Sequence, residues 1–201
     1  MVAAGTPTRF VGYDDLAIDT TITAIETLAD GQMLVKLAES PFYAQGGGQV
    51  GDSGVVIGAA GQGTVLEVYR VADDQVIRVS VDGVLAVGEG VRAQVDVPTR
   101  RATQSNHTVT HILHWALRDT FGTTTHQAGS YVGPDKMRFD FTLRERMNDE
   151  QRALFSRMQA LMTLLEGHAT FVMNAVAEGR VDDLDRMRNA LRDRRRSRGG
   201  V

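Results

Sequence analysis

Short runs rich in β-branched residues, bounded by glycine or aspartate, dominate the first half of the chain. They lie at residues 20–28, 33–37, 54–57, 64–71, 75–81 and 91–97. Such alternation is typical of strands joined by tight turns, and Asp30-Gly31 is a strong hairpin signal. Several short strands at this spacing predict a small antiparallel β-barrel or sandwich. We place it at residues 6–97, within a first domain of residues 1–97.

The composition changes at Pro98, which ends the last strand and is followed by helix-forming residues. We expect a helix that starts near Thr99 or Thr103 and ends at Asp119. Extended segments should follow at 126–131, 137–141 and 169–175, with further helices after Asn148 and after Asp182. Together they form a second domain, residues 98–201. Its arginine-rich end has no apolar stripe, so we expect a solvated, poorly ordered basic tail.

Three of the five histidines fall within this predicted helix. At about 100° per residue, His107, His111 and His114 share one stripe of the helix. The opposite side should face the core through Val109, Ile112, Leu113, Ala116 and Leu117. Because His107 and His111 are one turn apart, both imidazoles can reach one metal ion. The alternative is a pair of solvated surface histidines, because zinc usually takes three or four protein ligands.

Charge and composition narrow the possible partners. The chain has no cysteine, which excludes disulfides and thiolate chemistry, and its net charge of −3 argues against a generally basic nucleic-acid binder. Arg100 and Arg101 still make a local basic patch that could meet phosphate. No apolar run is long enough to span a membrane, and we expect a cytoplasmic protein.

A glycine-rich loop, residues 39–54, separates the second and third predicted strands. Five of its last nine residues are glycine. Glycine permits positive φ and lets backbone N–H groups approach a partner, so Gly46, Gly47 and Gly48 are candidate ligand contacts. Gln49 lies among them, where its amide can approach a ligand. The alternative is a flexible connection between two strands.

Three stretches together resemble a known family: the loop 39–54 (ESPFYAQGGGQVGDSG), the histidine helix 101–122 (RATQSNHTVTHILHWALRDTFG) and the segment 126–141 (HQAGSYVGPDKMRFDF). They are similar to the editing region of alanyl-tRNA synthetase and to the stand-alone alanyl-tRNA editing proteins. Residues 6–16 resemble the synthetase's lead into this region, so the likeness covers most of residues 6–190. The family usually has Glu where Gln45 stands here.

The resemblance implies an α+β fold, with a small antiparallel β-barrel followed by an α/β editing domain of the type shared by threonyl- and alanyl-tRNA synthetases. It also implies hydrolysis of the ester that joins a wrong amino acid, serine or glycine, to the tRNA for alanine. On this basis His107 and His111 match the first two zinc ligands. Gln49 and Thr110 match residues near the reacting ester and are the catalytic candidates.

The sequence departs from the family at the second half of the zinc site. The family completes it with a CxxxH motif, whereas this chain has no cysteine. We therefore expect an incomplete editing domain, with zinc held weakly or absent. His126, also a candidate substrate contact, or His168 could substitute as a ligand. The missing strands would leave a sheet edge open to a second chain.

Two functions follow from these observations. The first is an aminoacyl-tRNA deacylase that acts in trans on mischarged alanine tRNA. The alternative is a non-catalytic editing module that binds tRNA or a partner chain. A completed set of zinc ligands would favour the first, and its absence favours the second.

Overall fold

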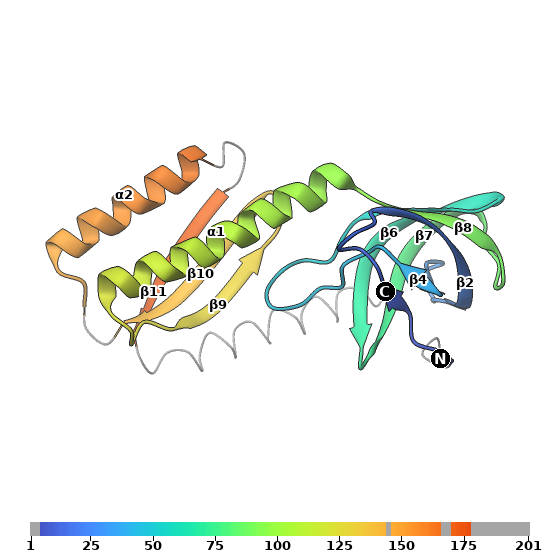
Figure 1. Cartoon of the computed structure of the whole chain (residues 1–201), viewed down its shortest axis with the longest axis horizontal. Helices are drawn as coiled ribbons and strands as arrows, with labels where there is room; N and C mark the ends of the chain where they lie inside the picture. Colours follow the sequence, from blue (N-terminus) through green and yellow to red (C-terminus); the bar gives the residue numbers. More distant parts are fainter. Residues whose placement is uncertain (1–4, 144–145, 166–169, 178–201) are drawn as a thin grey trace. The chain divides into compact units, whose positions relative to one another are not determined.

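A computed structural model describes residues 5–143, 146–165 and 170–177. The chain divides into two compact units, Met1–Ser105 and Asn106–Val201. The first unit contains strands β1 (Arg9–Phe10), β2 (Ala17–Thr27), β3 (Met33–Leu37), β4 (Glu39–Ser40), β5 (Gly54–Ile57), β6 (Ala60–Val71), β7 (Asp74–Val84) and β8 (Gly90–Val95). Helix α1 (Val97–Phe121) follows, and then come β9 (Gln127–Val132), β10 (Lys136–Leu143), α2 (Asp149–Leu165) and β11 (Thr170–Ala177). Figure 1 labels most of these elements.

Six strands of the first unit close into an antiparallel barrel in the order β2-β3-β7-β6-β5-β8. Its interior is filled by alternating apolar residues; in β8, for example, Val91, Ala93 and Val95 are buried while the residues between them are exposed. This alternation follows from the period of two along a strand. The predicted α+β fold, a barrel followed by an α/β region, is confirmed.

Strands β6 and β7 extend beyond the predicted ranges 64–71 and 75–81, through glycines outside those ranges. Gly61 in β6 pairs with Gly83 in β7. A Cβ atom at Gly83 would lie 2.4 Å from the carbonyl oxygen of Ala60, and its φ is +84°. Both glycines therefore permit a close backbone approach inside the hairpin, a common use of glycine within strands.

Helix α1 begins at Val97, slightly earlier than predicted. Asp96 caps it, because its carboxylate accepts a hydrogen bond from the backbone N–H of Thr99 at 3.2 Å. Pro98 is accommodated in the first turn, where its missing N–H costs nothing. The predicted cap of α2 is also present, since Asn148 and Gln151 exchange side-chain to backbone hydrogen bonds of 2.8 and 3.0 Å.

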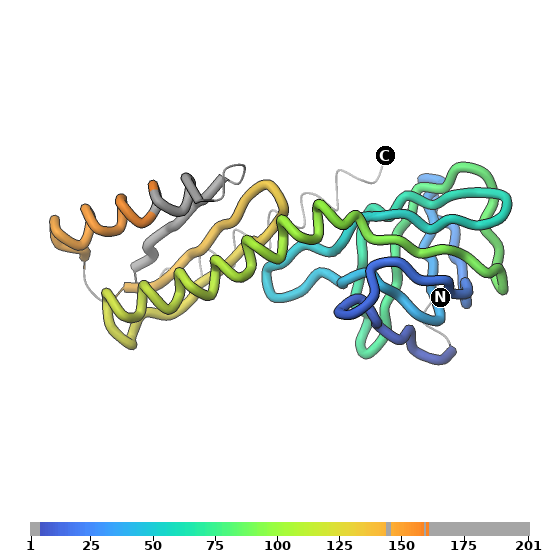
Figure 2. The backbone as a smooth tube through the Cα atoms, turned by 45° about the horizontal axis from the view of Figure 1, so that its top comes forward, coloured from blue at the N-terminus to red at the C-terminus, as the bar shows by residue number. Residues whose placement is uncertain are grey.

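The second unit is a three-stranded sheet in the order β11-β10-β9, with helix packing on one face. Strand β10 runs antiparallel to β9 and parallel to β11. Its core consists of Leu113, Leu117, Val132, Met137, Phe139 and Phe141, with Phe155 and Met158 of α2 packed against it. Leu113 and Leu117 belong to the second half of α1. Figures 1 and 2 both show the β9–β10 hairpin running beside that half of the helix. In the part of the chain described, β11 and β9 are the edge strands.

The core face of α1 differs from the predicted one. Leu113 and Leu117 are buried as expected, but Ile112 is 57% exposed and Trp115 69% exposed. The buried stripe is completed instead by the polar residues Asn106 and Thr110. The prediction that Ile112 faces the core was wrong. The side of α1 that packs against the sheet includes Leu113 and Leu117 but does not extend around the helix as far as Ile112.

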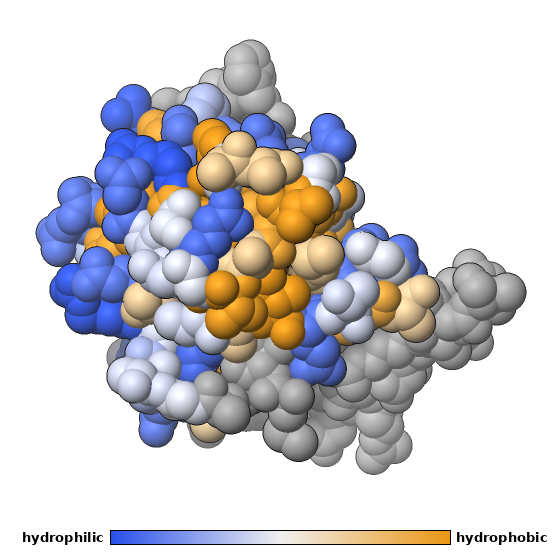
Figure 3. All heavy atoms as spheres, turned by 90° about the vertical axis from the view of Figure 1, so that its right-hand side faces the viewer, coloured by the Kyte–Doolittle hydropathy of each residue, from blue (hydrophilic) through white to orange (hydrophobic). Residues whose placement is uncertain are grey.

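Apolar side chains also reach the barrel surface. Figure 3 shows them gathered into a patch on the face that it views. The exposed apolar residues of the barrel include Ile57, Val84 and Val87. Single apolar residues are ordinary on protein surfaces, whereas a gathered group is a more probable place of contact.

Some of our expectations concern residues that the structure does not describe. The helix after Asp182, the basic tail and His168 lie outside the described residues. Among the helices that are described, none is long and apolar enough to cross a membrane.

Candidate functional site

The histidine pair lies on helix α1. The Nε2 atoms of His107 and His111 are 2.9 Å apart, and the ring centroids are 4.9 Å apart. His111 is exposed and His107 is half-buried. The rings therefore lie side by side, as their spacing of one helical turn predicts.

The electrostatics favour a neutral His107 at neutral pH. Burial lowers the pKa of His107 below its usual 6.5, and the nearby His111 lowers it further. A neutral imidazole carries a lone pair on one ring nitrogen, so it can accept a proton or bind a metal ion. At the 2.9 Å contact between the two Nε2 atoms, one ring donates and the other accepts.

The pair fits zinc only in part. Two nitrogens bound at 2.0–2.1 Å in a tetrahedral site would lie about 3.3 Å apart, so these rings would need to open by only a few tenths of an ångström. The number of ligands is the larger difficulty. Within the described ranges, no group of three or more His, Cys, Asp or Glu side chains is arranged to hold a metal ion. Two imidazoles fall short of the three or four protein ligands that zinc normally takes.

His114 lies apart from this pair. Its ring packs against Phe139, with centroids 5.5 Å apart, and its Nε2 is buried without a hydrogen-bond partner. Burial, followed by the charges of Arg118, His111 and His126, lowers its pKa. His114 thus packs between α1 and the sheet. The prediction that it lies on the same side of the helix as His107 and His111, away from the core, was wrong.

Thr110 lies one position before His111, on the buried side of α1. Its hydroxyl is 2.9 Å from the backbone oxygen of Asn106 and 2.6 Å from the sulfur of Met137. A hydroxyl has one proton to donate and two lone pairs, so it retains acceptor capacity. The catalytic role that the resemblance implies for Thr110 stays a prediction.

Asn106 is a residue that sequence analysis missed. It is 2% exposed, and its side-chain amide donates to the backbone oxygen of Gly133 at 2.7 Å. This bond fixes the turn between β9 and β10 to the helical turn that carries His107. A buried asparagine on an otherwise apolar stripe was the available signal, because buried amides are almost always hydrogen-bonded.

The glycine-rich loop in the first unit is a formed turn. The backbone N–H of Gly46 donates to the oxygen of Gln49 at 3.1 Å, and the reverse bond is 2.9 Å. Gly47 and Gly48 both have positive φ, +59° and +87°, which is the pattern of a type I′ turn. The N–H of Gly46 is engaged within this turn, and both interpretations of the stretch, a ligand contact and a flexible connection, stay predictions. The proximity of Gln49 to the histidines stays a prediction.

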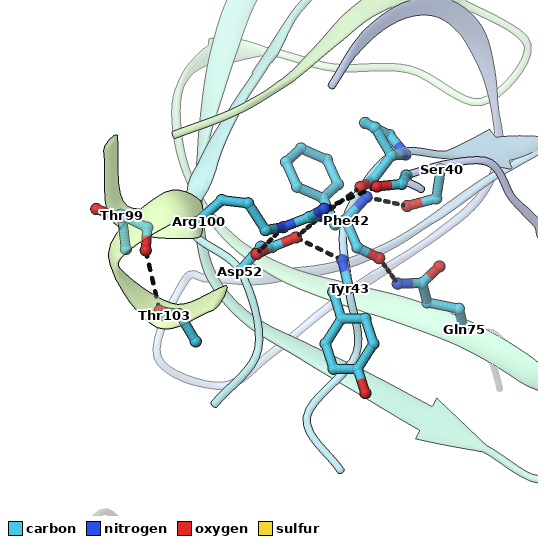
Figure 4. A network of polar contacts seen from close by, with 10 residues as sticks. Ser40, Phe42, Tyr43, Asp52, Gln75, Thr99, Arg100 and Thr103 are labelled. Carbon is cyan, nitrogen blue, oxygen red and sulfur yellow. Dashed lines mark hydrogen bonds and ion pairs between the residues drawn. The ribbon is translucent and has the colours of Figure 1, made fainter. Parts of the chain in front are cut away.

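Arg100 is buried in the first unit, and Figure 4 shows its polar contacts. Its Nε donates to Asp52 at 2.8 Å, its second terminal nitrogen also binds Asp52, and further bonds reach the backbone oxygens of Gly12 and Pro41. It is 4% exposed and therefore unavailable to a phosphate. Its neighbour Arg101 is exposed, as is His126 in the second unit. These two keep the proposed role of contacting tRNA.

Comparison with known proteins places these features in context. Residues 2–99 match the family model of class II (A) tRNA synthetases, and residues 89–201 match that of zincin-like metallopeptidases. The chain is 44% identical over 159 residues to the alanine–tRNA ligase of Rubrobacter xylanophilus, covering 78% of this chain and 18% of that protein. It is 36% identical over 191 residues to that of Janthinobacterium sp., covering 90% of this chain and 21% of the relative. The chain thus spans about a fifth of the length of these relatives.

His107 and His111, within the metallopeptidase match, have the i, i+4 spacing of two zinc-binding histidines. Zinc metalloproteases of this type use H-E-x-x-H, in which the glutamate after the first histidine is the general base. Thr108 occupies that position here. The residues therefore share the histidine spacing of that family but lack its base.

Proposed function

Because the chain belongs to the alanyl-tRNA synthetase family, as an editing-type fragment, we propose that it hydrolyses the ester of mischarged alanine tRNA in trans. The observation that carries the proposal is the pair of imidazoles on α1, whose Nε2 atoms are 2.9 Å apart and of which His111 is exposed. The family resemblance gives the substrate as serine or glycine esterified to the 3′ end of the tRNA.

The reaction needs an activated water. Water attacks the ester carbonyl, the bond from that carbon to the ribose oxygen breaks, and the free amino acid and the tRNA hydroxyl result. A neutral imidazole next to the ester accepts the proton from the attacking water and returns one to the leaving oxygen. The lowered pKa of His107 keeps it neutral and suits it to this role.

Other residues would hold the tRNA. Arg101 is exposed near the start of α1 and would contact phosphate, and His126 is exposed at the start of the β9–β10 hairpin. Gln49 and the glycine turn before it would approach the aminoacyl end, as the family resemblance implies. Zinc would be held by His107 and His111 only with a further ligand, so no step of the proposal depends on it.

A second candidate function is a non-catalytic module that binds tRNA or a partner chain. The specific observation in its favour is the short donor set, because the described residues bring no third ligand to the pair. The edge strands β9 and β11 would offer a second chain a place to pair. This module would retain tRNA binding without turnover.

Deacylation of alanine tRNA charged with serine or glycine separates the two candidates. We expect the full chain to release the amino acid and His107→Ala to lose at least about a hundredfold in rate, the usual contribution of a general base. Trp115→Gln, an exposed change on the same helix, is the matched control. Binding of uncharged tRNA without any deacylation, with or without added zinc, would favour the non-catalytic module.

A further inference from the structure

The barrel carries a small cavity that the proposed reaction does not use. Its volume is about 260 Å³, slightly below the range of about 300–1,000 Å³ typical of small-molecule pockets. It is therefore suited to a group no larger than a nucleotide. The residues that line the cavity include Phe10, Tyr43, Arg70, Ala72, Asp73 and Asp74.

One wall of the cavity is aromatic and continues onto the surface. Phe10 lies edge-on to Tyr13, with ring centroids 5.0 Å apart, and 6.2 Å from Tyr43. Tyr13 is 82% exposed, so its ring is accessible beside the cavity. Exposed aromatic rings next to a cavity are a common platform for unpaired bases, because every base has a π-face that can stack.

A cation lies at the same cavity. Arg70 is exposed, and among the described residues it has no ion-pair partner. Asp74 also lines the cavity but is paired with the buried Lys36, which leaves Asp73 as the unpaired acid. An arginine beside aromatic rings can bind a phosphate while the base occupies the aromatic wall.

The backbone at the cavity supplies an independent observation. Ala72 has φ of +54°, the only described non-glycine residue with positive φ. It lies in the tight turn between β6 and β7, where Val71 pairs with Asp74. A left-handed alanine costs free energy, and such strain gathers at binding sites. Here Ala72 is followed in the turn by Asp73, while Arg70 lies near the end of β6.

We propose that this cavity binds an unpaired nucleotide, with the base against Phe10, Tyr13 and Tyr43 and the phosphate at Arg70. A duplex would not fit, because its bases are stacked within the helix and the cavity admits only one nucleotide. An aliphatic ligand would make no use of the cation. The site is separate from the histidine pair, so its binding does not depend on hydrolysis.

The test is a titration of the full chain with a five-nucleotide single-stranded RNA, with AMP, and with an RNA duplex of the same composition. Backbone amide shifts in NMR spectra report where each probe binds. We expect the single strand to move the amides of residues 70–75 and the duplex to leave them unchanged. Saturable AMP binding at the same amides would support the same chemistry with a free nucleotide as its source.

Three variants test the assigned roles. Tyr13→Ala should weaken binding about tenfold through lost stacking, and Arg70→Gln should weaken it several-fold and reduce its salt dependence. Asp73→Asn should strengthen binding, because it removes a negative charge near the phosphate. The matched control is Arg92→Gln, which removes an exposed arginine elsewhere on the barrel. Equal effects of Arg70→Gln and Arg92→Gln, or duplex binding as tight as single-strand binding, would overturn the proposal.

Discussion

Arg100 binds both carboxylate oxygens of Asp52, although the two residues are 48 positions apart and both side chains are almost fully buried. Asp52 also accepts a hydrogen bond from the backbone N–H of Tyr43 at 2.6 Å. The pair therefore connects the start of α1, the end of the glycine-rich loop and the loop after β4. Figure 4 shows these contacts.

The first prediction concerns this pair. Asp52→Ala should lower the free energy of unfolding of the barrel by about 3–5 kcal/mol, because it leaves a buried guanidinium without its counter-charge. Chemical denaturation followed by circular dichroism measures the loss. Asp19→Ala is the matched control, since it breaks the exposed pair with Arg92 and should cost about 0–1 kcal/mol. A similar small cost at both sites would contradict the assigned role of Asp52.

The second prediction concerns Lys36 and Asp74. Burial opposes ionisation of Asp74, but hydrogen bonds from Lys36 and from the backbone N–H groups of Thr8 and Gln75 outweigh it and hold its pKa below the usual value. A lowered carboxyl pKa gives stability that is present above pH 4 and is lost as the pH falls through the folded-state pKa. Lys36→Met should lower stability at pH 7 and reduce this acid-side loss, because only the backbone hydrogen bonds of Thr8 and Gln75 then lower the pKa of Asp74. Unfolding measured between pH 2 and 7 tests it; an unchanged profile would contradict the pairing.

The third prediction concerns His114. Its lowered pKa means that, as the pH falls below about 6.5, the unfolded state takes up a proton that the folded state resists. Stability should therefore fall between pH 7 and the folded-state pKa. His114→Leu removes the buried, unpaired Nε2 and should flatten this decline, leaving a smaller slope from His107. Thermal unfolding at a series of pH values measures both slopes, and parallel curves would show that His114 is not the source.

The fourth prediction concerns metal binding at the histidine pair. We expect weak zinc binding that weakens further as the pH falls through the lowered pKa of His107, because protons then compete with the metal ion for its imidazole. His111→Ala should abolish the binding and change the free energy of unfolding by less than about 0.5 kcal/mol. Calorimetric titration and chelator competition measure the affinity. Stoichiometric zinc that survives dialysis against a chelator would show instead that further ligands complete the site.

Local patterns predicted most of the fold. The β-branched runs, the turn at Asp30-Gly31 and the cap at Asn148 depend on neighbouring residues, so they could be read from the sequence. The pairing of Gly61 with Gly83 could not, because glycine signals a turn and a close cross-strand approach equally well. The exposure of Ile112 depends on which stripe of α1 meets the sheet, and that is set by tertiary packing.

The candidate site was predicted to a similar extent. Spacing alone placed His107 beside His111, since one helical turn separates them. Arg100 looked like a surface cation, and its burial became apparent only with its distant partner Asp52. The role of Asn106 was missed because a hydrogen bond to a distant backbone oxygen, that of Gly133, cannot be predicted from residue types.

The closure of the barrel has a consequence for its synthesis. Strand β2 pairs with β8, the last barrel strand to be made. At about 5–20 residues per second, the end of β8 is synthesised roughly 3–14 s after the end of β2. During this interval the nascent chain exposes an unpaired strand edge, so β2 is the segment that a co-translational chaperone would most need to protect.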